Sequence, residues 1–166
     1  MASITLGGNP VNTVGSLPEI GNKAPEFYLT NTDMASKKLE DYAGKKVVMN
    51  IFPSVDTGVC ATSVRKFNEK AASLNNTVVL CISRDLPFAQ KRFCGAEGIS
   101  NVEMLSDFKD ASFGMNYGIL MEDGKFAKLH ARSVVVLNET GNVIHTELVP
   151  EIAQEPNYDA VYAVLG

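Results

Sequence analysis

Residues 46–60 read KVVMNIFPSVDTGVC, and this stretch decides the fold. Its first seven residues form a near-continuous apolar run, which predicts a strand buried on both faces of a sheet. Beyond Pro53, apolar or small side chains recur at alternating spacings of four and three residues, at Cys60, Val64, Phe67, Ala71 and Leu74. This periodicity predicts a helix, and Asp56 or Thr57 is a suitable N-cap for it. A strand that runs through a short loop into a helix is typical of an α/β sheet.

The rest of the chain continues the alternation of strands and helices. Further strands are predicted over residues 27–29, 77–83, 102–106, 133–138 and 143–149. A helix is predicted with Asp85 as its cap and Pro87 in its first turn, running to about Phe93, with Gly95 placed to end it. Further helices are predicted over residues 111–117 and 157–165. Strands at 3–6 and 11–14 flank residues 7–10 as an N-terminal hairpin. The order predicts an α/β fold with a mixed central sheet, helices on both faces and an N-terminal β-hairpin.

Length and composition limit the classes of protein that this chain can belong to. With 166 residues and 17.9 kDa, the chain fits one domain spanning residues 1–166. Its 45% apolar and 20% charged content excludes a disordered or fibrous chain. A net charge of −4 gives no general attraction for nucleic acid. We find no apolar run of membrane-spanning length and no secretory signal before Lys23, so we expect a cytoplasmic protein that engages no membrane.

Cys60 is the strongest candidate for chemistry. It falls in the first turn of the predicted helix, where free N–H groups and the helix dipole favour a thiolate, the nucleophilic form. Thr57, three residues earlier, can bring its hydroxyl to the same pocket, and the Cys60 N–H and a fixed cation are further candidate donors. The alternatives are a small buried cysteine at a helix start and a threonine that only caps the helix.

The other cysteines differ in their predicted surroundings. Cys81 lies inside the strand TVVLCIS and reads as an inert core thiol. Cys94 lies near the end of a short helix, where a partner thiol could move. A metal site would have to combine cysteines with His130 and His145, and the chain lacks paired ligand spacing, so we expect no metal and no cofactor.

Two separate cysteine motifs carry a resemblance to a known family. Residues 50–60, NIFPSVDTGVC, contain P-x-x-x-T-x-x-C, and residues 85–98 read DLPFAQKRFCGAEG. The segments GNPV, AGKKVVMNIFP and EPNYDAVYAVL agree with them. The sequence therefore resembles the thiol peroxidase branch of the peroxiredoxins over nearly its whole length. Members of this branch are atypical two-cysteine peroxiredoxins.

The resemblance implies a thioredoxin-like fold and a role for each matching residue. Pro53 would shape and shield the pocket, and Thr57 would hydrogen-bond the sulfur and the peroxide oxygen. Cys60 would be the peroxidatic nucleophile. Arg132, otherwise an ordinary surface arginine, would hold the thiolate and polarise the O–O bond. Cys94 would be the resolving cysteine, so that a Cys60–Cys94 disulfide forms within the chain and thioredoxin reduces it. The resemblance also implies a homodimer.

A disulfide needs the Cα atoms of its two cysteines to lie within roughly 4.4–6.8 Å of each other. The first turn of the helix at Cys60 and the helix from Pro87 to Cys94 would therefore have to unwind locally in each cycle. The substrates would be hydrogen peroxide and organic (alkyl) hydroperoxides. For the organic hydroperoxides, the pocket is expected to have an apolar wall formed by Phe52, Pro53, Phe88, Phe93 and Ile119.

Three alternative functions stay open. The first is a thioredoxin-like disulfide reductase, although the chain lacks the C-x-x-C motif of such enzymes. The second is a redox sensor switched by a Cys60–Cys94 bridge, and the third is a structural domain with three buried thiols.

Overall fold

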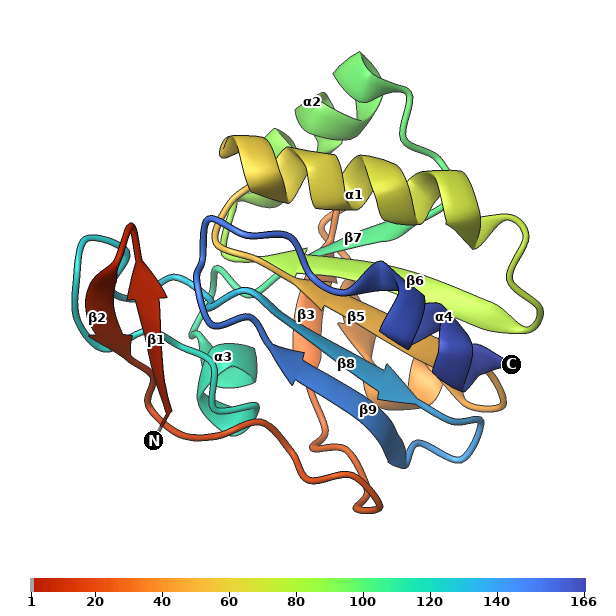
Figure 1. Cartoon of the computed structure of the whole chain (residues 1–166). Coiled ribbons are helices and arrows are strands. Elements are labelled where there is room, and N and C mark those ends of the chain that lie inside the picture. The colour runs from red at the N-terminus through yellow and green to blue at the C-terminus, as the bar shows by residue number, and fades with distance from the viewer. Residues whose placement is uncertain (1) are drawn as a thin grey trace.

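A seven-stranded mixed sheet forms the centre of the molecule (Figure 1). The computed structural model describes residues 2–166. The strands are β1 (Ser3–Leu6), β2 (Asn9–Asn12), β3 (Tyr28–Asn31), β4 (Ser36–Lys38), β5 (Lys46–Ile51), β6 (Thr77–Ser83), β7 (Glu103–Ser106), β8 (Ser133–Leu137) and β9 (Val143–Leu148). The helices are η1 (Leu39–Tyr42), α1 (Gly58–Ala71), α2 (Pro87–Glu97), α3 (Ser112–Asn116) and α4 (Tyr158–Leu165). The central sheet has the order β4-β3-β7-β6-β5-β8-β9.

Strand β5 lies inside this sheet, as its apolar run predicts. It pairs in parallel with β6 and antiparallel with β8, and every residue from Val47 to Ile51 is buried. Its side chains alternate between two cores, with Val47 and Met49 in one and Val48 in the other. Because β5 packs against a core on each face, the position of its carboxyl end, where the next loop begins, is well defined.

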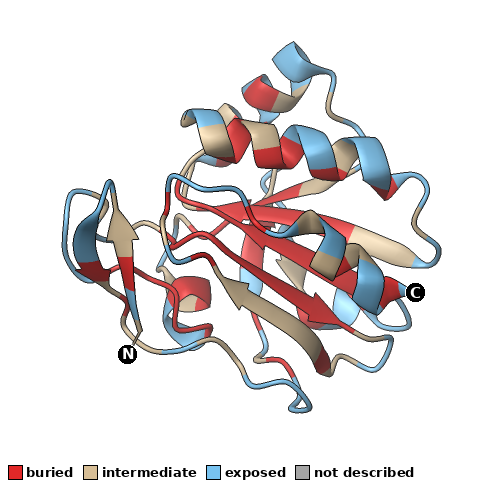
Figure 2. Ribbon diagram, in the orientation of Figure 1, coloured by how far each residue is buried: buried red, intermediate tan, exposed pale blue. Residues whose placement is uncertain are grey.

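Helices cover both faces of the sheet, which confirms the predicted layering. Helices α1, α2 and α4 contribute Val64, Phe93 and Val161 to the core on one face. Helix α3 contributes Phe113 to the core on the other face, together with the N-terminal hairpin. Figure 2 shows the buried central strands between elements whose outward sides are exposed. None of the helices within residues 2–166 is long and apolar enough to cross a membrane.

The N-terminal hairpin is present, but its second strand starts earlier than predicted. Strand β2 begins at Asn9 and ends at Asn12, and Leu6 pairs with Asn9. The turn is only two residues long, because Gly7 and Gly8 both adopt positive φ angles, 58° and 83°. Pro10 is therefore a strand residue, which the edge of a two-stranded sheet tolerates.

The bounds of two helices also differ from the prediction. Helix α2 continues past Gly95 to Glu97 and ends at Gly98, which takes the left-handed conformation with φ 67° and donates its N–H to the Cys94 carbonyl. Cys94 therefore lies within the helix rather than at its end. Helix α1 begins at Gly58, directly after the predicted N-cap Thr57, but it ends at Ala71, before the last residue of the apolar spacing, Leu74.

Strand β4 and the short helix η1 are not predicted from the sequence. Strand β4 is three residues long and contains two lysines, and it forms the exposed edge next to β3. A short, charged edge strand protects a sheet from further pairing, but it lacks the alternation from which strands are recognised.

Candidate active site

Cys60 lies in the first turn of α1, at the carboxyl end of β5. Thr57 occupies the N-cap position, Gly58 begins the helix, and Cys60 is fully buried. The first N–H groups of a helix have no partner inside it, and here the Ala61 N–H is the first to bond back along the chain, to the Thr57 carbonyl at 3.0 Å. Cys60 therefore lies in the first turn of the helix, as the sequence predicts.

Thr57 occupies the predicted N-cap position of α1, but its side chain does not act as a cap. The Thr57 hydroxyl does not cap the helix but donates to the Ser54 carbonyl at 3.1 Å. Within residues 2–166 it makes no hydrogen bond to the Cys60 sulfur. Asp56 faces outward and accepts from Arg92 at 3.3 Å, with both side chains exposed. Asp56 thus places no carboxylate against the sulfur.

Arg132 provides the fixed cation. Antiparallel pairing of β5 with β8 sets Ser133 opposite Ile51, so Arg132 lies at the end of β5 that leads into the loop. Its Nη2 donates to Cys60 Sγ at 3.2 Å, and its Nε donates to the Ile152 carbonyl at 2.8 Å. The residue is only 2% exposed, which excludes the surface arginine that its sequence context suggests. A guanidinium keeps its positive charge when buried, and so it favours the thiolate.

A pocket of about 170 Å³ opens beside the Cys60–Arg132 pair. Its lining joins the first turn of α1 to the hairpin and two distant loops: Leu6, Thr57, Gly58, Val59, Phe126, Arg132, Ile152 and Ala153. Arg132 both lines this pocket and contacts the sulfur, so the pocket leads to the immediate neighbour of the buried thiol.

The predicted apolar wall is wrong in its residues. Phe52 and Ile119 are core side chains with no exposure, and Phe93 packs in the core beneath α2. Phe88 is 65% exposed and points away from the core, while Pro53 is buried in the loop. None of these lines the pocket, because its apolar side chains come from β1 and from the segments around residues 126 and 152. No local pattern in the sequence could have brought those segments together.

Beneath Cys60, a buried polar chain reaches Cys81. The Ser63 hydroxyl donates to the Cys60 carbonyl at 2.8 Å, and Asn50 Nδ2 donates to Ser63 Oγ at 3.2 Å. The same amide points to Cys81 Sγ at 3.7 Å. Burial raises the pKa of Cys81 to about 12, so this thiol stays protonated, which agrees with its reading as an inert core residue.

Cys94 is half-buried on α2 and packs against the same core that contains Cys60. Cys60, Cys81 and Cys94 are all free thiols. Burial raises the pKa of Cys94 above the ordinary value of a thiol. Cys94 also lines a separate hollow of about 330 Å³ with Lys91 and Asp33, on the α2–β7 side. Cys60 on α1 and Cys94 on α2 therefore contact the same core, and no disulfide joins them.

His130 pairs with a buried carboxylate. His130 Nε2 lies 2.8 Å from Asp107 Oδ2, and both side chains are buried. Asp107 also accepts from the Phe113 and Gly114 N–H groups at the start of α3. His130 and Asp107 thus tie α3 to the segment before β8.

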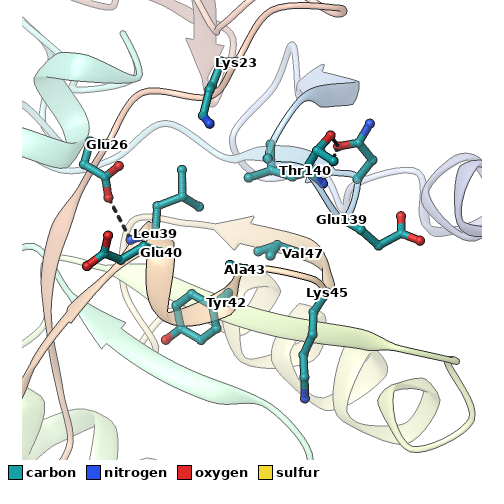
Figure 3. Close-up of a pocket in the computed structure, with 13 residues that line it drawn as sticks. Lys23, Glu26, Leu39, Glu40, Tyr42, Ala43, Lys45, Val47, Glu139 and Thr140 are labelled. Carbon is teal, nitrogen blue, oxygen red and sulfur yellow. Dashed lines mark hydrogen bonds between the residues drawn. The ribbon is translucent and has the colours of Figure 1, made fainter.

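Another pocket, of about 180 Å³, lies at the opposite end of β5 (Figure 3). Figure 3 shows charged side chains around it, including Lys23, Lys45 and Glu139, and a hydrogen bond from the Leu39 N–H to Glu26 at 3.1 Å. Its lining contains no thiol. The pocket beside Arg132 is therefore the candidate active site.

Ser54 and Asp85 contribute to the site, although the sequence does not predict it. The sequence places Asp85 as the cap of α2, but Leu86 holds that position and Asp85 instead accepts from Ser54 Oγ at 2.6 Å and from the Val55 N–H at 2.9 Å. A carboxylate before a proline is a common start for a helix, so local sequence favours the cap. Only tertiary structure shows that the carboxylate faces the loop of Cys60.

Comparison with known proteins identifies the family of this chain. The Redoxin family matches residues 19–162. The chain is 60% identical over 166 residues to a thiol peroxidase of Mycobacterium tuberculosis, covering 100% of this chain and 99% of the relative. It is 55% identical to a thiol peroxidase of Corynebacterium glutamicum, with full coverage of both chains. A crystal structure of a peroxiredoxin-like protein from Aquifex aeolicus superposes with a TM-score of 0.94 at 39% identity, covering 99% of this chain and 96% of that one. The chain therefore belongs to the Redoxin family, within which it is an enzyme of the thiol peroxidase branch of the peroxiredoxins.

Proposed function

We propose that the Cys60 thiolate is the peroxidatic nucleophile. The observation that carries this proposal is the 3.2 Å hydrogen bond from Arg132 Nη2 to Cys60 Sγ, made inside a buried pair beside an open pocket. The thiolate is the nucleophilic form of a cysteine, and a fixed guanidinium beside the sulfur stabilises that negative charge. The first-turn N–H groups of α1 act in the same direction.

In the first step, the thiolate attacks one oxygen of the peroxide along the O–O bond. A sulfur–oxygen bond forms, the O–O bond breaks, and the leaving oxygen takes up a proton to become water or an alcohol. Cys60 becomes a sulfenic acid. Arg132 Nη1 is buried and makes no hydrogen bond within residues 2–166, so it is available to donate to the leaving oxygen. Thr57 lines the same pocket, and its hydroxyl donates to the Ser54 carbonyl. Pro53 restricts the backbone of the loop between β5 and α1.

We propose both hydrogen peroxide and organic hydroperoxides as substrates. Leu6, Val59, Phe126 and Ile152 give the pocket an apolar lining for an alkyl group. A larger hollow of about 590 Å³ begins at the same Leu6 and Phe126 and extends along the hairpin. Because the two spaces share lining residues, the hollow is a candidate position for a substituent beyond the reacting oxygens.

In the second step, the Cys94 thiol condenses with the sulfenic acid. A sulfur–sulfur bond forms within the chain and water leaves. Because Cys60 is fully buried and Cys94 is on another helix, the first turn of α1 and part of α2 have to unwind for the sulfurs to meet. Thioredoxin then reduces the disulfide by thiol exchange, its own two thiols being oxidised.

The proposal is tested by thioredoxin-coupled peroxide reduction with three serine variants. Cys60→Ser should abolish turnover. Cys94→Ser should consume about one equivalent of peroxide and then stop. Cys81→Ser is the matched control and should keep most of the activity, since Cys81 lies in the core away from the pocket. Retained turnover in Cys60→Ser would refute the assignment, and stoichiometric oxidation of the wild type without turnover would instead indicate a sensor.

The family also suggests a homodimer, which light scattering would test. Exposed apolar side chains at Leu86 and Phe88, 52% and 65% exposed, are available for burial between copies. A cytoplasmic location stays a prediction from the sequence.

A further inference from the structure

Asp85 is a junction between the two cysteine-bearing segments. Its Oδ1 accepts from Ser54 Oγ at 2.6 Å, and its Oδ2 accepts from the Val55 N–H at 2.9 Å and from Ser83 Oγ at 2.6 Å. Its own backbone carbonyl accepts from the Ser106 hydroxyl. One carboxylate therefore joins the end of β6 to the loop between β5 and α1, without lining the pocket.

On one side, Asp85 holds the loop that shapes the Cys60 pocket. Ser54, which donates to Asp85, accepts the Thr57 N–H at 3.2 Å and the Thr57 hydroxyl at 3.1 Å through its carbonyl. The Ser54 hydroxyl also accepts the Asp56 N–H at 3.1 Å. The position of Thr57 and the start of α1 thus depend on a serine that the Asp85 carboxylate fixes.

On the other side, the same carboxylate reaches α2. Ser83 Oγ donates to Asp85 and accepts from Gln90 Nε2 at 3.2 Å. Gln90 is fully buried and also donates to the Leu105 carbonyl at 2.9 Å. Gln90 precedes Cys94 by about one helical turn. The network therefore fastens the first half of the helix that bears the proposed resolving cysteine.

The two steps of the proposed cycle make opposite demands on this network. Attack on peroxide needs the loop and α1 in place, with Thr57 and Arg132 around the sulfur. Disulfide formation needs the same loop and α2 to come apart. Resting on that proposed function, we propose that Asp85 is a positioning residue whose hydrogen bonds favour the peroxide-reactive arrangement and so set the relative rates of peroxide attack and disulfide formation.

The test is Asp85→Asn, with each step measured separately. An amide has one acceptor oxygen for three donors, so at least one hydrogen bond to the loop or to Ser83 is weakened. The rate of Cys60 oxidation is followed by rapid quenching and mass spectrometry in a Cys94→Ser background. We expect it to fall about tenfold, the effect of losing about one hydrogen bond to a charged group. The rate of disulfide formation, followed in the chain with Cys94 intact, should rise severalfold.

The opposite signs separate positioning from general loss of structure. If both rates fall together, or if neither changes, the inference is overturned. Asp56→Asn is the matched control, because it makes the same chemical change in the same loop at an exposed ion pair with Arg92; both rates should stay within about twofold. If Asp85→Asn does not fold, Ser54→Ala and Ser83→Ala decide the question, since each removes one donor to the carboxylate. Wild-type turnover and its loss in Cys60→Ser are measured alongside, so a failure of the proposed function is seen independently.

Discussion

Arg132 Nη2 lies 3.2 Å from Cys60 Sγ, although the two residues are 72 positions apart in the chain. The contact exists because β8 runs antiparallel to β5, which brings the residue before β8 to the end of β5. The guanidinium is held from a second direction by the Ile152 carbonyl at 2.8 Å. It is therefore a fixed donor, already aimed before any substrate arrives.

Arg132→Lys should keep the charge and lose the activity. A lysine ammonium is a point charge on a flexible stem, and it cannot bond the sulfur and the Ile152 carbonyl in the fixed geometry of a guanidinium. We expect the second-order rate constant for peroxide to fall about a hundredfold, as when one preorganised donor is removed. Arg65→Lys, at an exposed pair with Glu97, is the control and should change little. Near-normal rates in a folded Arg132→Lys protein would remove the main support for the proposed mechanism.

Thr57 offers a comparison of a hydroxyl with a methyl group of the same shape. Thr57 lines the pocket, and Thr57→Val removes the hydroxyl that donates to the Ser54 carbonyl, so we expect an approximately tenfold slower reaction with peroxide. Thr57→Ser keeps the hydroxyl and should stay close to the wild type. The measurement is the rate of Cys60 oxidation in single turnover. Equal rates for the valine and serine variants would show that the Thr57 hydroxyl contributes nothing to the reaction with peroxide.

The sequence predicts the local parts of this site well. The apolar run before Pro53 and the spacing from Cys60 to Phe67 determine β5 and α1, because both patterns report which faces of an element are buried. The thiol in the first turn of α1 follows directly from them.

The parts that depend on long-range packing are less predictable. The motif resemblance picks out Arg132, whereas its immediate neighbours would suggest a surface residue. Leu6 and Phe126 reach the pocket from the hairpin and a distant loop, and no periodicity connects them to Cys60. Asp85 has the local signature of a helix cap, yet the hydroxyls of Ser54 and Ser83 are the donors it meets. Gly95 and Gly98 both could end α2, and only the backbone shows which one has the left-handed φ.

Phe126 should matter more for organic hydroperoxides than for hydrogen peroxide. It lines both the pocket at Arg132 and the larger hollow beside the hairpin, so an alkyl group entering there would contact it. Phe126→Ser should lower the rate constant for cumene hydroperoxide about tenfold, since the lost apolar contact is worth roughly 1.5–3 kcal/mol when fully buried. The rate with hydrogen peroxide should change little. A parallel loss for both substrates would place the alkyl group elsewhere.

Cys94 should be a sluggish thiol in the reduced, folded enzyme. Burial raises its pKa, so its thiolate appears only at pH values above those typical of a free thiol. Alkylation of Cys94 by iodoacetamide in a Cys60→Ser protein should therefore have a pH midpoint above about 8.5. Addition of urea should lower this midpoint, since the burial that causes the shift is then lost. A midpoint at or below the ordinary value in the folded protein would contradict the burial of Cys94.

Glu151 links the acid stability of the enzyme to the loop that holds Arg132. Its carboxylate accepts from the Ala153 N–H at 2.8 Å, the Gly8 N–H at 2.9 Å and the Thr5 hydroxyl at 3.0 Å, and so ties the hairpin to the loop of Ile152. These bonds, led by that of Ala153, lower the pKa of Glu151 to about 2. A carboxylate whose pKa is depressed by folding stabilises the protein above its unfolded pKa, and this contribution is lost as the pH falls towards the folded value.

The corresponding prediction compares Glu151→Gln with the wild type by urea unfolding at a series of pH values. Between about pH 5 and 7 the variant should be less stable by a constant amount, because Glu151 is ionised in both the folded and the unfolded wild type. Below the ordinary glutamate pKa of about 4.3 the difference should shrink and approach its minimum near the folded pKa of about 2. Glu139→Gln, at an exposed glutamate, is the control and should show no such narrowing. A difference in unfolding free energy that stays the same across the acid range would mean that the Glu151 charge contributes nothing to holding the hairpin against the loop of Ile152.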